Sequence, residues 1–582
     1  MKIKSAYFDN YRNLTGLTIS FNDDISYIVG ENNIGKSNIL NAINGILNNY
    51  KFSEQDFYDC EKPITVELSL SLSDDEIGMF GDLIDPETGN SINLIISQSI
   101  DDLYLSVKHK ESQTEINSKI LKQSNVIYYD SIRNPKNELT FDKTKGAGLF
   151  LNYIIKNYIN QQGSEECDFV KKDNINEVLT YIEDTLNKIN IVKDNQIKPS
   201  FNLGNIDFLS KIFSLQDSKN IDIKNSGYGI QYSLLIIFAL LEKIINIKKT
   251  CSETNLNAIL MFDEPEIHLH PFAQRTLINK IKKIATGTDT DFNTILKDMF
   301  GIESFSAQII IVSHSDRIVG SNFKNIIRLY KENSNIKSIS GALINFEDND
   351  KNLEKHLILQ TPYFAEALFA RFVIIVEGAS EYGALKKMAE KMNIDLDEKG
   401  ISIVKADGKD SIIPLIKLFE FFKIQVIAIK DRDLGVQDTD IEYIEKGLLK
   451  ITNERDFETE LLADFKNFDN LIAAINEYGV GINIDIQAPM AEKYRNKYNL
   501  NNISTITSNL HWEDISENLN LTYLFLLSRL TKEKSVTLGL LIGEYLDKDN
   551  IPVLYKDILN LAKDKTQDEW FIRTKKEYNR KT

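Results

Sequence analysis

Short strand-like runs alternate with helix-like segments from Phe372 onward, and this alternation constrains the fold of the 582-residue chain more than any other feature. The runs are FVIIVEG, ISIVKADG and QVIAIKD, and the segments between them, one through Met392 and one through Phe422, place apolar residues at helical spacing. Successive strands joined through helices form a parallel sheet, because each connection must cross back over the sheet. This order predicts a small parallel α/β sheet with helices on both faces.

Acidic residues stand at the ends of two of these runs. Glu377 follows VIIV, and Asp431 and Asp433 follow VIAIK, 54 positions after Glu377 in the case of Asp431. The carboxyl ends of parallel strands meet at one edge of a sheet, so these side chains are expected to converge there and bind Mg²⁺, with Mn²⁺ as an alternative. Acidic residues at strand ends are also common as solvated loop starts. The other candidate ligands, including a second metal locus, are Glu381, Asp456 and Glu458.

A phosphate-binding motif lies near the N-terminus. The segment GENNIGKS fits G-x-x-x-x-G-K-[ST], and it joins a strand-like run, ISYIV, to a helical one, SNILNAINGIL. In this arrangement backbone N–H groups cradle the phosphates, Lys36 reaches the β- and γ-phosphate oxygens and Ser37 binds Mg²⁺. The motif therefore predicts that the chain binds ATP. The residues concerned are Gly30, Asn32, Asn33, Gly35, Lys36, Ser37 and Asn38.

Three later segments complete the set that ATP hydrolysis needs. Asp263 ends the run ILMFD and is expected to hold Mg²⁺, and Glu264 beside it is expected to polarise the attacking water. His314 ends a second run, IIIVSH, from which its imidazole is expected to reach the γ-phosphate. The segment NSGYGIQYS opens an apolar helix whose positive N-terminal end favours an anion. Its candidate contacts are Ser226, Gly227 and Gly229.

These four segments resemble the Walker A, signature, Walker B and switch-histidine elements of the ABC-type ATPases related to SMC and recombination-repair proteins, although the signature departs from the usual LSGGQ. In that family the signature of one copy completes the ATP site of another, so the resemblance implies a head-to-tail homodimer or a higher even oligomer. It also implies that Arg12 lies near the nucleotide, with a surface salt bridge as the alternative. His268 and His270 form an H-x-H pair, which without a third ligand is expected to be structural.

The segments VEGASE and KDRD, in this order, resemble the TOPRIM fold of topoisomerases, primases and some nucleases. An ATPase followed by a TOPRIM domain resembles the OLD (overcoming lysogenization defect) nucleases, which include the nuclease subunit of Gabija-type antiphage systems and retron-associated members. The resemblance implies that Glu377 is the general acid/base or first metal ligand and that Asp431 and Asp433 hold Mg²⁺. It also implies a lysine that assists the scissile phosphate. Lys534 is the candidate, with Lys532 close by, and a lysine on a solvated helix is the alternative.

The expected domain boundaries follow these motifs. Residues 142–215 lie between ATPase motifs, and apolar residues within 174–189 recur every three to four positions, as in an amphipathic helix. This helical insertion is expected to pair with a second copy, with an intramolecular cap on the ATPase as the alternative. The full division is a discontinuous ABC-type ATPase domain over 1–141 and 216–345, the insertion over 142–215, a hinge over 346–370, and a TOPRIM domain with a C-terminal helical extension over 371–582.

Composition limits the classes of function. The net charge of −17 argues against a protein that coats nucleic acid by bulk attraction, but a nuclease needs only a local basic stripe. Lys430 and Arg432 flank the acidic pair, where they are expected either to bind phosphate or to weaken metal binding. The three cysteines stand far apart, which gives no disulfide framework or zinc spacing, and no apolar run is long enough for a membrane span. A cytoplasmic chain is expected.

The leading hypothesis is a homodimeric, Mg²⁺-dependent DNA endonuclease that is gated by its ATPase domain and serves in antiphage defence. An ATP-switched sensor or scaffold that binds nucleic acid or a partner without cleavage is the second hypothesis. A nuclease that acts on RNA, such as a tRNA-cleaving toxin, is the third. A topoisomerase or primase is disfavoured, because few residues remain for a strand-passage gate and no cysteine cluster exists for zinc. A helicase or a retron component encoded nearby is the expected kind of partner.

Overall fold

The chain forms two compact units, Met1–Leu343 and Ile344–Thr582, in the computed structural model. The described residues are 1–85, 89–130, 138–139, 141, 147–162, 172–201, 213–249, 254–319, 322–333, 335–344, 361–433, 435–479 and 486–566. Most of the predicted hinge over 346–370 therefore lies outside the described residues. Its described part, α13 (Thr361–Ala367), belongs to the second unit, where Phe364 packs on Phe419 with ring centroids 5.8 Å apart.

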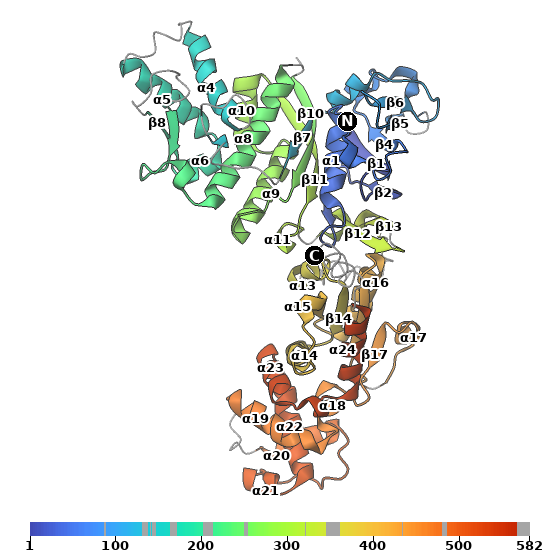
Figure 1. The fold of residues 1–582 in the computed structure, drawn as a ribbon. Helices are drawn as coiled ribbons and strands as arrows, with labels where there is room; N and C mark the ends of the chain where they lie inside the picture. Colours follow the sequence, from blue (N-terminus) through green and yellow to red (C-terminus); the bar gives the residue numbers. More distant parts are fainter. Residues whose placement is uncertain are drawn as a thin grey trace, which may run out of the picture. The chain divides into compact units, whose positions relative to one another are not determined.

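Two sheets form the frame of the first unit (Figure 1). The antiparallel sheet has the order β2 (Leu17–Ser20), β1 (Lys2–Asp9), β4 (Ile64–Ser71), β5 (Ser91–Gln98) and β6 (Ser106–His109). The second sheet has the order β13 (Asn335–Ser340), β12 (Ile326–Glu332), β3 (Ile25–Val29), β11 (Ser304–Val312), β10 (Asn255–Asp263) and β7 (Val126–Tyr129). Its strands run parallel except for β13, so the carboxyl ends of β3, β11 and β10 lie side by side.

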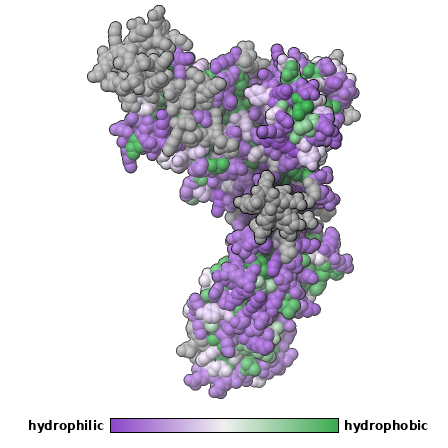
Figure 2. Space-filling view, viewed as in Figure 1, coloured by the Kyte–Doolittle hydropathy of each residue, from purple (hydrophilic) through white to green (hydrophobic). Residues whose placement is uncertain are grey.

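Helices cover both faces of the second sheet (Figure 1). Helix α1 (Lys36–Leu47) buries Ile39, Ile43 and Ile46 in a core shared with the antiparallel sheet. The opposite face carries α8 (Tyr228–Lys248), α9 (Pro271–Ala285) and α10 (Thr290–Phe300). Among the described residues, α8 is the one helix long and apolar enough to span a membrane, but 72% of its apolar window is buried inside this core. It is therefore a core helix, and the face of the chain seen in Figure 2 is mostly hydrophilic.

The region predicted as a helical insertion packs against its own ATPase unit. Its helices are α4 (Ala147–Gln162), α5 (Lys172–Leu186) and α6 (Asn190–Asp194), and their apolar residues join the core around α8. Phe150 lies 5.4 Å from Phe238 of α8, and the Tyr153 hydroxyl donates to the Met299 carbonyl oxygen at 3.1 Å. The insertion is not purely helical, because β8 (Lys198–Phe201) and β9 (Phe213–Gln216) form an antiparallel pair. The described part thus acts as an intramolecular cap, and its role in pairing with a second copy stays a prediction.

A four-stranded parallel sheet forms the centre of the second unit, as the strand and helix alternation predicts. Its order is β15 (Ile401–Lys405), β14 (Phe372–Val376), β16 (Gln425–Lys430) and β17 (Leu449–Ile451). Alternate residues of β14 face opposite sides, and Phe372, Ile374 and Val376 share a core with α14 (Ala379–Lys391). Helix α16 (Ile412–Phe421) packs against β14 and β16 outside that core, so helices cover both faces.

The C-terminal extension is helical and packs on the α14 face of this sheet. Its helices are α18 (Phe457–Leu462), α19 (Phe468–Glu477), α20 (Ala488–Lys497), α21 (Trp512–Ser516), α22 (Leu519–Lys532), α23 (Val536–Tyr545) and α24 (Val553–Lys565). Helices α14 and α23 cross with their backbones in contact, since a Cβ on Gly383 would lie 2.2 Å from the Val536 carbonyl oxygen. This close crossing fixes Lys534, which precedes α23, beside the start of α14.

Candidate functional site

The first candidate site lies at the carboxyl ends of β3, β10 and β11, and its loop has the geometry of a phosphate-binding loop. Gly30 and Gly35 have φ of +153° and +103°, and Cβ atoms there would lie 2.8 Å from the Leu329 carbonyl oxygen and the Asn13 Oδ1. Glycine is therefore required at both positions. Asn32 and Asn33 lie exposed at the tip of the loop, and α1 begins at its last residues.

The Lys36 ammonium is folded into this loop. Its Nζ donates to the carbonyl oxygens of Gly30 at 2.9 Å and Glu31 at 2.7 Å, and its side chain is buried. Burial lowers the pKa of Lys36 to about 8, against the opposing effect of the Glu264 and Asp263 carboxylates. The amine is thus buried, and a phosphate group would offset the cost of its desolvation.

The two predicted ligands for the nucleotide-bound Mg²⁺ are in contact. The Ser37 Oγ donates to the Asp263 Oδ1 at 2.9 Å, which joins the start of α1 to the end of β10. Burial raises the pKa of Asp263 to about 6, and nearby carboxylates add to the rise while the Ser37 hydrogen bond opposes it. A buried carboxylate with raised pKa beside a hydroxyl is an environment that a divalent cation would stabilise.

Glu264 and His314 face each other across the ends of β10 and β11. The His314 Nε2 lies 3.3 Å from the Glu264 Oε1. Glu264 has φ of +48°, a conformation that is strained for a non-glycine residue and is often found at functional sites. Burial and the Lys36 ammonium lower the pKa of His314, so its ring is neutral at neutral pH. The Glu266 Oε1 accepts hydrogen bonds from the His314 backbone N–H at 2.8 Å and the Ser313 hydroxyl at 2.7 Å, which fixes this strand end.

Arg12 lies against the phosphate-loop helix and forms the salt bridge expected as the alternative, while its position near the nucleotide stays a prediction. Its guanidinium pairs with Asp56 at 2.7 Å, and its Nη1 donates to the Asn38 Oδ1 at 2.6 Å. Asn38 Nδ2 in turn donates to the Asn13 Oδ1 at 2.8 Å. Arg12 therefore braces the first turn of α1.

The signature segment lies at the start of α8. Gly227 caps the helix, Gly229 lies in its first turn, and the Gln231 Nε2 donates to the Ser226 carbonyl oxygen at 2.7 Å. The Ser226 Oγ is buried and has no hydrogen-bond partner. Within the described part of a single chain, no hydrogen bond or ion pair joins these residues to the phosphate-binding loop.

The second candidate site lies at the carboxyl ends of β14 and β16. Because these strands are parallel neighbours, Glu377 and Asp431 lie together, and the Asp431 backbone N–H donates to the Glu377 Oε2 at 3.2 Å. The Asp431 Oδ1 accepts from the Phe457 backbone N–H at 3.1 Å, which ties α18 to the same point. The predicted convergence of Glu377 and Asp431 is thus present in the structure.

Glu381 and Glu458 bring two buried carboxylates to this point. The Glu381 Oε2 caps α14 by accepting from the Gly378 backbone N–H at 2.9 Å, whereas its Oε1 is buried without a partner. Glu458 is 1% exposed and lies 2.9 Å from the Lys534 Nζ. Together these groups surround a cavity of about 290 Å³. The charged residues that line it are Glu377, Glu381, Asp407, Asp431, Glu458 and Lys534.

The charges of this cavity favour a cation. Burial raises the pKa of Glu377, Glu381, Asp431 and Glu458, and repulsion between neighbouring carboxylates adds to the rise, which Lys534 opposes. Within the described ranges, no three His, Cys, Asp or Glu side chains already form a closed metal-ligand group. The carboxylates are neighbours rather than a finished coordination shell, as expected for like charges with no cation between them. Hard oxygen donors and the unpartnered Glu381 oxygen fit a divalent ion such as Mg²⁺.

Two predicted metal ligands have other contacts. Asp456 caps α18 by accepting from the Thr459 backbone N–H at 3.0 Å, and its second oxygen accepts from the Tyr498 hydroxyl at 2.8 Å. Both of its oxygens therefore serve the fold, which removes Asp456 from the proposed metal set. Asp433 lies outside the cavity at its exposed edge, with φ of +47°, and pairs with Lys409 at 3.2 Å.

Lys430 does not point toward the acidic cavity. It is buried, and its Nζ contacts both carboxylate oxygens of Asp440, at 2.8 and 2.9 Å. This pair ties β16 to α17 (Asp438–Glu445). The expectation that Lys430 binds phosphate or weakens metal binding is wrong, because its charge is already paired inside the fold.

Two protein-family descriptions match this arrangement of domains. Residues 1–147 and 95–319 match the AAA ATPase domain, and residues 368–433 match the TOPRIM domain of overcoming lysogenization defect protein-like chains. The ATPase match alone covers more than half of the chain. The chain therefore belongs to the AAA ATPase domain family, and its second unit matches the OLD-like TOPRIM domain.

Two named nucleases are similar to this chain over most of its length. The Old nuclease of Escherichia phage P2 is 26% identical over 536 residues, which is 82% of each chain. The endonuclease GajA of Bacillus cereus (strain HuB5-5) is 22% identical over 529 residues, which is 75% of this chain and 74% of that one. The solved C-terminal region of the Burkholderia pseudomallei OLD protein is 20% identical, with a TM-score of 0.24, and covers 34% of this chain and 100% of its own.

Sequence reasoning missed two acidic residues of these two sites. Asp407 lines the acidic cavity from the loop after β15, with φ of +54°, and Glu266 fixes the His314 backbone. A signal existed for Asp407, because the run ISIVKADG also ends in an acid. His268 and His270 are structural, as expected. The His268 ring lies 4.8 Å from that of Tyr232, and His270 caps α9.

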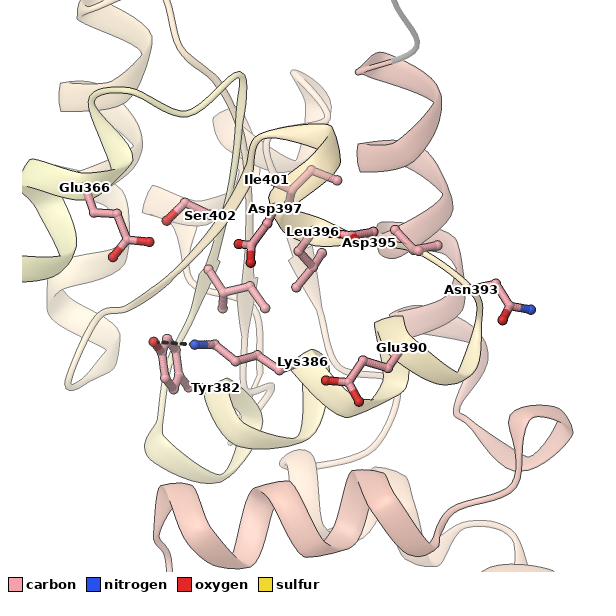
Figure 3. Close-up of a pocket in the computed structure, with 12 residues that line it drawn as sticks. Glu366, Tyr382, Lys386, Glu390, Asn393, Asp395, Leu396, Asp397, Ile401 and Ser402 are labelled. Atoms are coloured by element: carbon pink, nitrogen blue, oxygen red, sulfur yellow. Dashed lines mark hydrogen bonds between the residues drawn. The ribbon is translucent and has the colours of Figure 1, made fainter. Parts of the chain in front are cut away.

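A second cavity of this TOPRIM domain, of about 590 Å³, lies beside α14, α15 (Leu396–Lys399) and β15 (Figure 3). The Lys386 Nζ donates to the Tyr382 hydroxyl at 2.9 Å there. Two of its acids have local partners, because Glu390 pairs with Lys387 at 2.8 Å and Asp395 caps α15. It shares no lining residue with the acidic cavity, so it is distinct from the proposed catalytic centre.

Proposed function

We propose that this chain is an ATP-binding, Mg²⁺-dependent endonuclease that cuts DNA under the control of its ATPase domain. The observation that carries the proposal is the cavity in which Glu377, Asp431, Glu381 and Glu458 meet Lys534. The matches to an ATPase domain and to an OLD-like TOPRIM domain support an ATPase joined to a nuclease, and the relatives named above are a nuclease and an endonuclease.

The residues of the cavity have distinct proposed roles. Glu377, Glu381, Asp431 and Glu458 would hold the divalent ion, with Asp433 at the exposed edge. A bound ion would neutralise phosphate charge and promote ionisation of a water molecule. Burial raises the pKa of Glu377, which makes this carboxylate a stronger base and suits it to accept a proton during the reaction. Lys534 is partly exposed on the same cavity, from which its ammonium would contact the scissile phosphate.

The ATPase unit would act as the control. Lys36, Ser37 and Asp263 would bind Mg²⁺-ATP, Glu264 would polarise the attacking water and His314 would contact the γ-phosphate. The exposed start of α8 supports the proposal that a second copy completes this site. We therefore propose that the chain forms a homodimer. From the resemblance to the OLD nucleases, we also propose that its biological role is antiphage defence.

Plasmid cleavage tests the proposal. Purified chain is mixed with supercoiled plasmid in Mg²⁺ or Mn²⁺, with EDTA as the blank, and nicked and linear products are measured. Glu377→Ala should lose cleavage by at least about 10²-fold, whereas Glu390→Ala, an exposed acid on α14, should cut like the wild type. Undiminished cutting by Glu377→Ala would overturn the site. Nucleotide-dependent DNA binding without metal-dependent strand breaks would instead support a non-cleaving switch, and preferential loss of RNA would change the substrate.

A further inference from the structure

Two arginines beside the acidic cavity are held in place by hydrogen bonds to backbone carbonyl oxygens, which do not neutralise their charge. The Arg432 Nη1 donates to the Asn453 carbonyl oxygen at 2.8 Å, and the Arg455 Nη1 donates to the Lys497 carbonyl oxygen at 2.6 Å. In the part of the chain that the structure describes, neither guanidinium forms an ion pair with a carboxylate. A guanidinium carries five N–H donors, so one hydrogen bond to a carbonyl oxygen uses only a small part of the donor capacity of each arginine.

Both arginines belong to the segments that build the cavity. The Asp433 backbone N–H donates to the Arg455 carbonyl oxygen at 2.8 Å, and the Arg432 backbone N–H donates to the Thr452 hydroxyl at 2.9 Å. Arg432 stands between Asp431 and Asp433, and Arg455 lies two residues before Phe457, whose backbone N–H holds Asp431. The guanidiniums are therefore fixed at the exposed rim of the cavity rather than on a remote surface.

Tyr498 orders the cations of this rim. The Arg455 Cζ lies 4.8 Å and the Lys497 Nζ 5.0 Å from the centre of the Tyr498 ring, and the Tyr494 ring stacks on it at 6.3 Å. The Tyr498 hydroxyl donates to the Asp456 cap of α18, the helix that carries Glu458. Ordering a long cationic side chain in advance lowers the entropy lost when it binds a ligand. The rim is thus built to present positive charge.

The positive charge of this rim contrasts with the negative charge of the rest of the chain. The chain has a net charge of −17 and an acidic cavity, both of which repel a polyanion. Phosphate oxygens are acceptors that match a guanidinium with free N–H groups. We propose that Arg432, Arg455 and Lys497 contact the nucleic-acid backbone next to the cleavage position and hold the strand over the cavity. This inference rests on the proposed endonuclease function and names its substrate-binding edge.

Equilibrium binding without cleavage tests the inference. A short fluorescein-labelled DNA duplex is titrated with the full chain in EDTA at several salt concentrations, and anisotropy gives Kd and its salt dependence. The triple variant Arg432→Gln, Arg455→Gln, Lys497→Gln should lower the slope of log Kd against log salt by about 2–3, because each lost phosphate contact removes about 0.9. The matched control is Lys466→Gln, an exposed lysine of the same unit. Arg432→Lys with Arg455→Lys keeps the charge and should retain most of the slope.

The outcomes separate this inference from the nuclease itself. Weaker binding with a smaller slope supports the rim, and in Mg²⁺ the triple variant should then show a higher KM with kcat largely kept. An unchanged Kd and slope overturns the rim, even if the wild type cuts DNA. If the triple variant loses binding but the wild type never cuts, the rim stands and the endonuclease proposal fails. A melting temperature equal to that of the wild type shows that the variant folds.

Discussion

Replacing Glu381 with glutamine tests whether Glu381 is a metal ligand or only a structural acid. Glu381 is fully buried, caps α14 through one oxygen and leaves the other without a partner. Glutamine keeps an oxygen for the Gly378 N–H and removes the charge. Burial, with repulsion from Glu377 and Glu458, raises the pKa of Glu381 above its unfolded value. Such a group binds its proton more tightly in the folded state. The free energy of unfolding therefore falls as pH rises from the pKa of the unfolded state to that of the folded state.

The magnitude follows from this pKa. Each unit of rise corresponds to about 1.4 kcal/mol, and fully buried carboxyls rise by up to about 3–5 units. In EDTA at about pH 8, Glu381→Gln should therefore be more stable than the wild type by about 2–4 kcal/mol, and by less than about 1 kcal/mol at about pH 4.5. For a unit of this size, this is a melting shift of roughly 5–10 °C at the higher pH.

Magnesium should remove most of this difference. At a concentration about 100-fold above its Kd, Mg²⁺ adds about 2.7 kcal/mol to a protein that binds it only when folded. A variant whose affinity is about 100-fold lower gains only about 0.4 kcal/mol at the same concentration. Glu390→Gln on the exposed face of α14 serves as the control and should follow the wild type in every buffer.

Differential scanning calorimetry of the full chain, with and without Mg²⁺ at both pH values, measures these shifts. If Glu381→Gln melts below the wild type in EDTA at the higher pH, the carboxylate is not a destabilising charge. If Mg²⁺ raises both melting temperatures equally, Glu381 is not a ligand. Either result would refute the electrostatic account of the cavity.

The remaining predictions concern groups outside that cavity. Glu264→Gln should lower ATP hydrolysis by about 10²–10⁴-fold, measured as phosphate release, while nucleotide binding measured by calorimetry persists; equal hydrolysis would exclude Glu264 as the water-polarising group. Because the pKa of Asp263 is raised to about 6, Mg²⁺-ATP affinity should increase as pH rises through that value, and Asp263→Asn should flatten the profile. Asp440→Asn leaves the buried Lys430 charge uncompensated and should cost about 3–5 kcal/mol in urea unfolding, whereas a loss below about 1 kcal/mol would show that this pair is dispensable.

The ATPase motifs could be read from the sequence because they are local. The phosphate-binding loop needs glycines, a lysine and a serine within eight positions, and the surrounding strand and helix follow from hydrophobic spacing. The structure shows Ser37 in contact with Asp263 and Glu264 facing His314, while the roles of these residues at a nucleotide stay predictions. The pairing of Arg12 with both Asp56 and Asn38 joins distant segments, so the sequence alone left two alternatives. The structure shows the salt bridge, and a position near the nucleotide stays a prediction.

The acidic cavity could be read only in part. Glu377 and Asp431 were predictable because parallel strand order places their ends side by side. The different contacts of Asp456 and Glu458 were not predictable, because the two residues are only two positions apart. In α18 the Asp456 side chain contacts Tyr498, whereas the Glu458 side chain contacts Lys534. Lys430 likewise turns into the fold toward Asp440, while Arg432 remains at the rim.

The sequence by itself determined the nucleotide-binding motifs, the carboxylate motifs, the parallel sheet and the family. These features follow from periodicity and short motifs, each of which involves only a few neighbouring residues. Only the tertiary structure decided which charges share a cavity. The glycine-mediated crossing of α14 and α23 brings Lys534 beside carboxylates from three other segments, and burial there raises their pKa values. Dielectric surroundings and contacts between distant segments arise from packing, which local patterns do not encode.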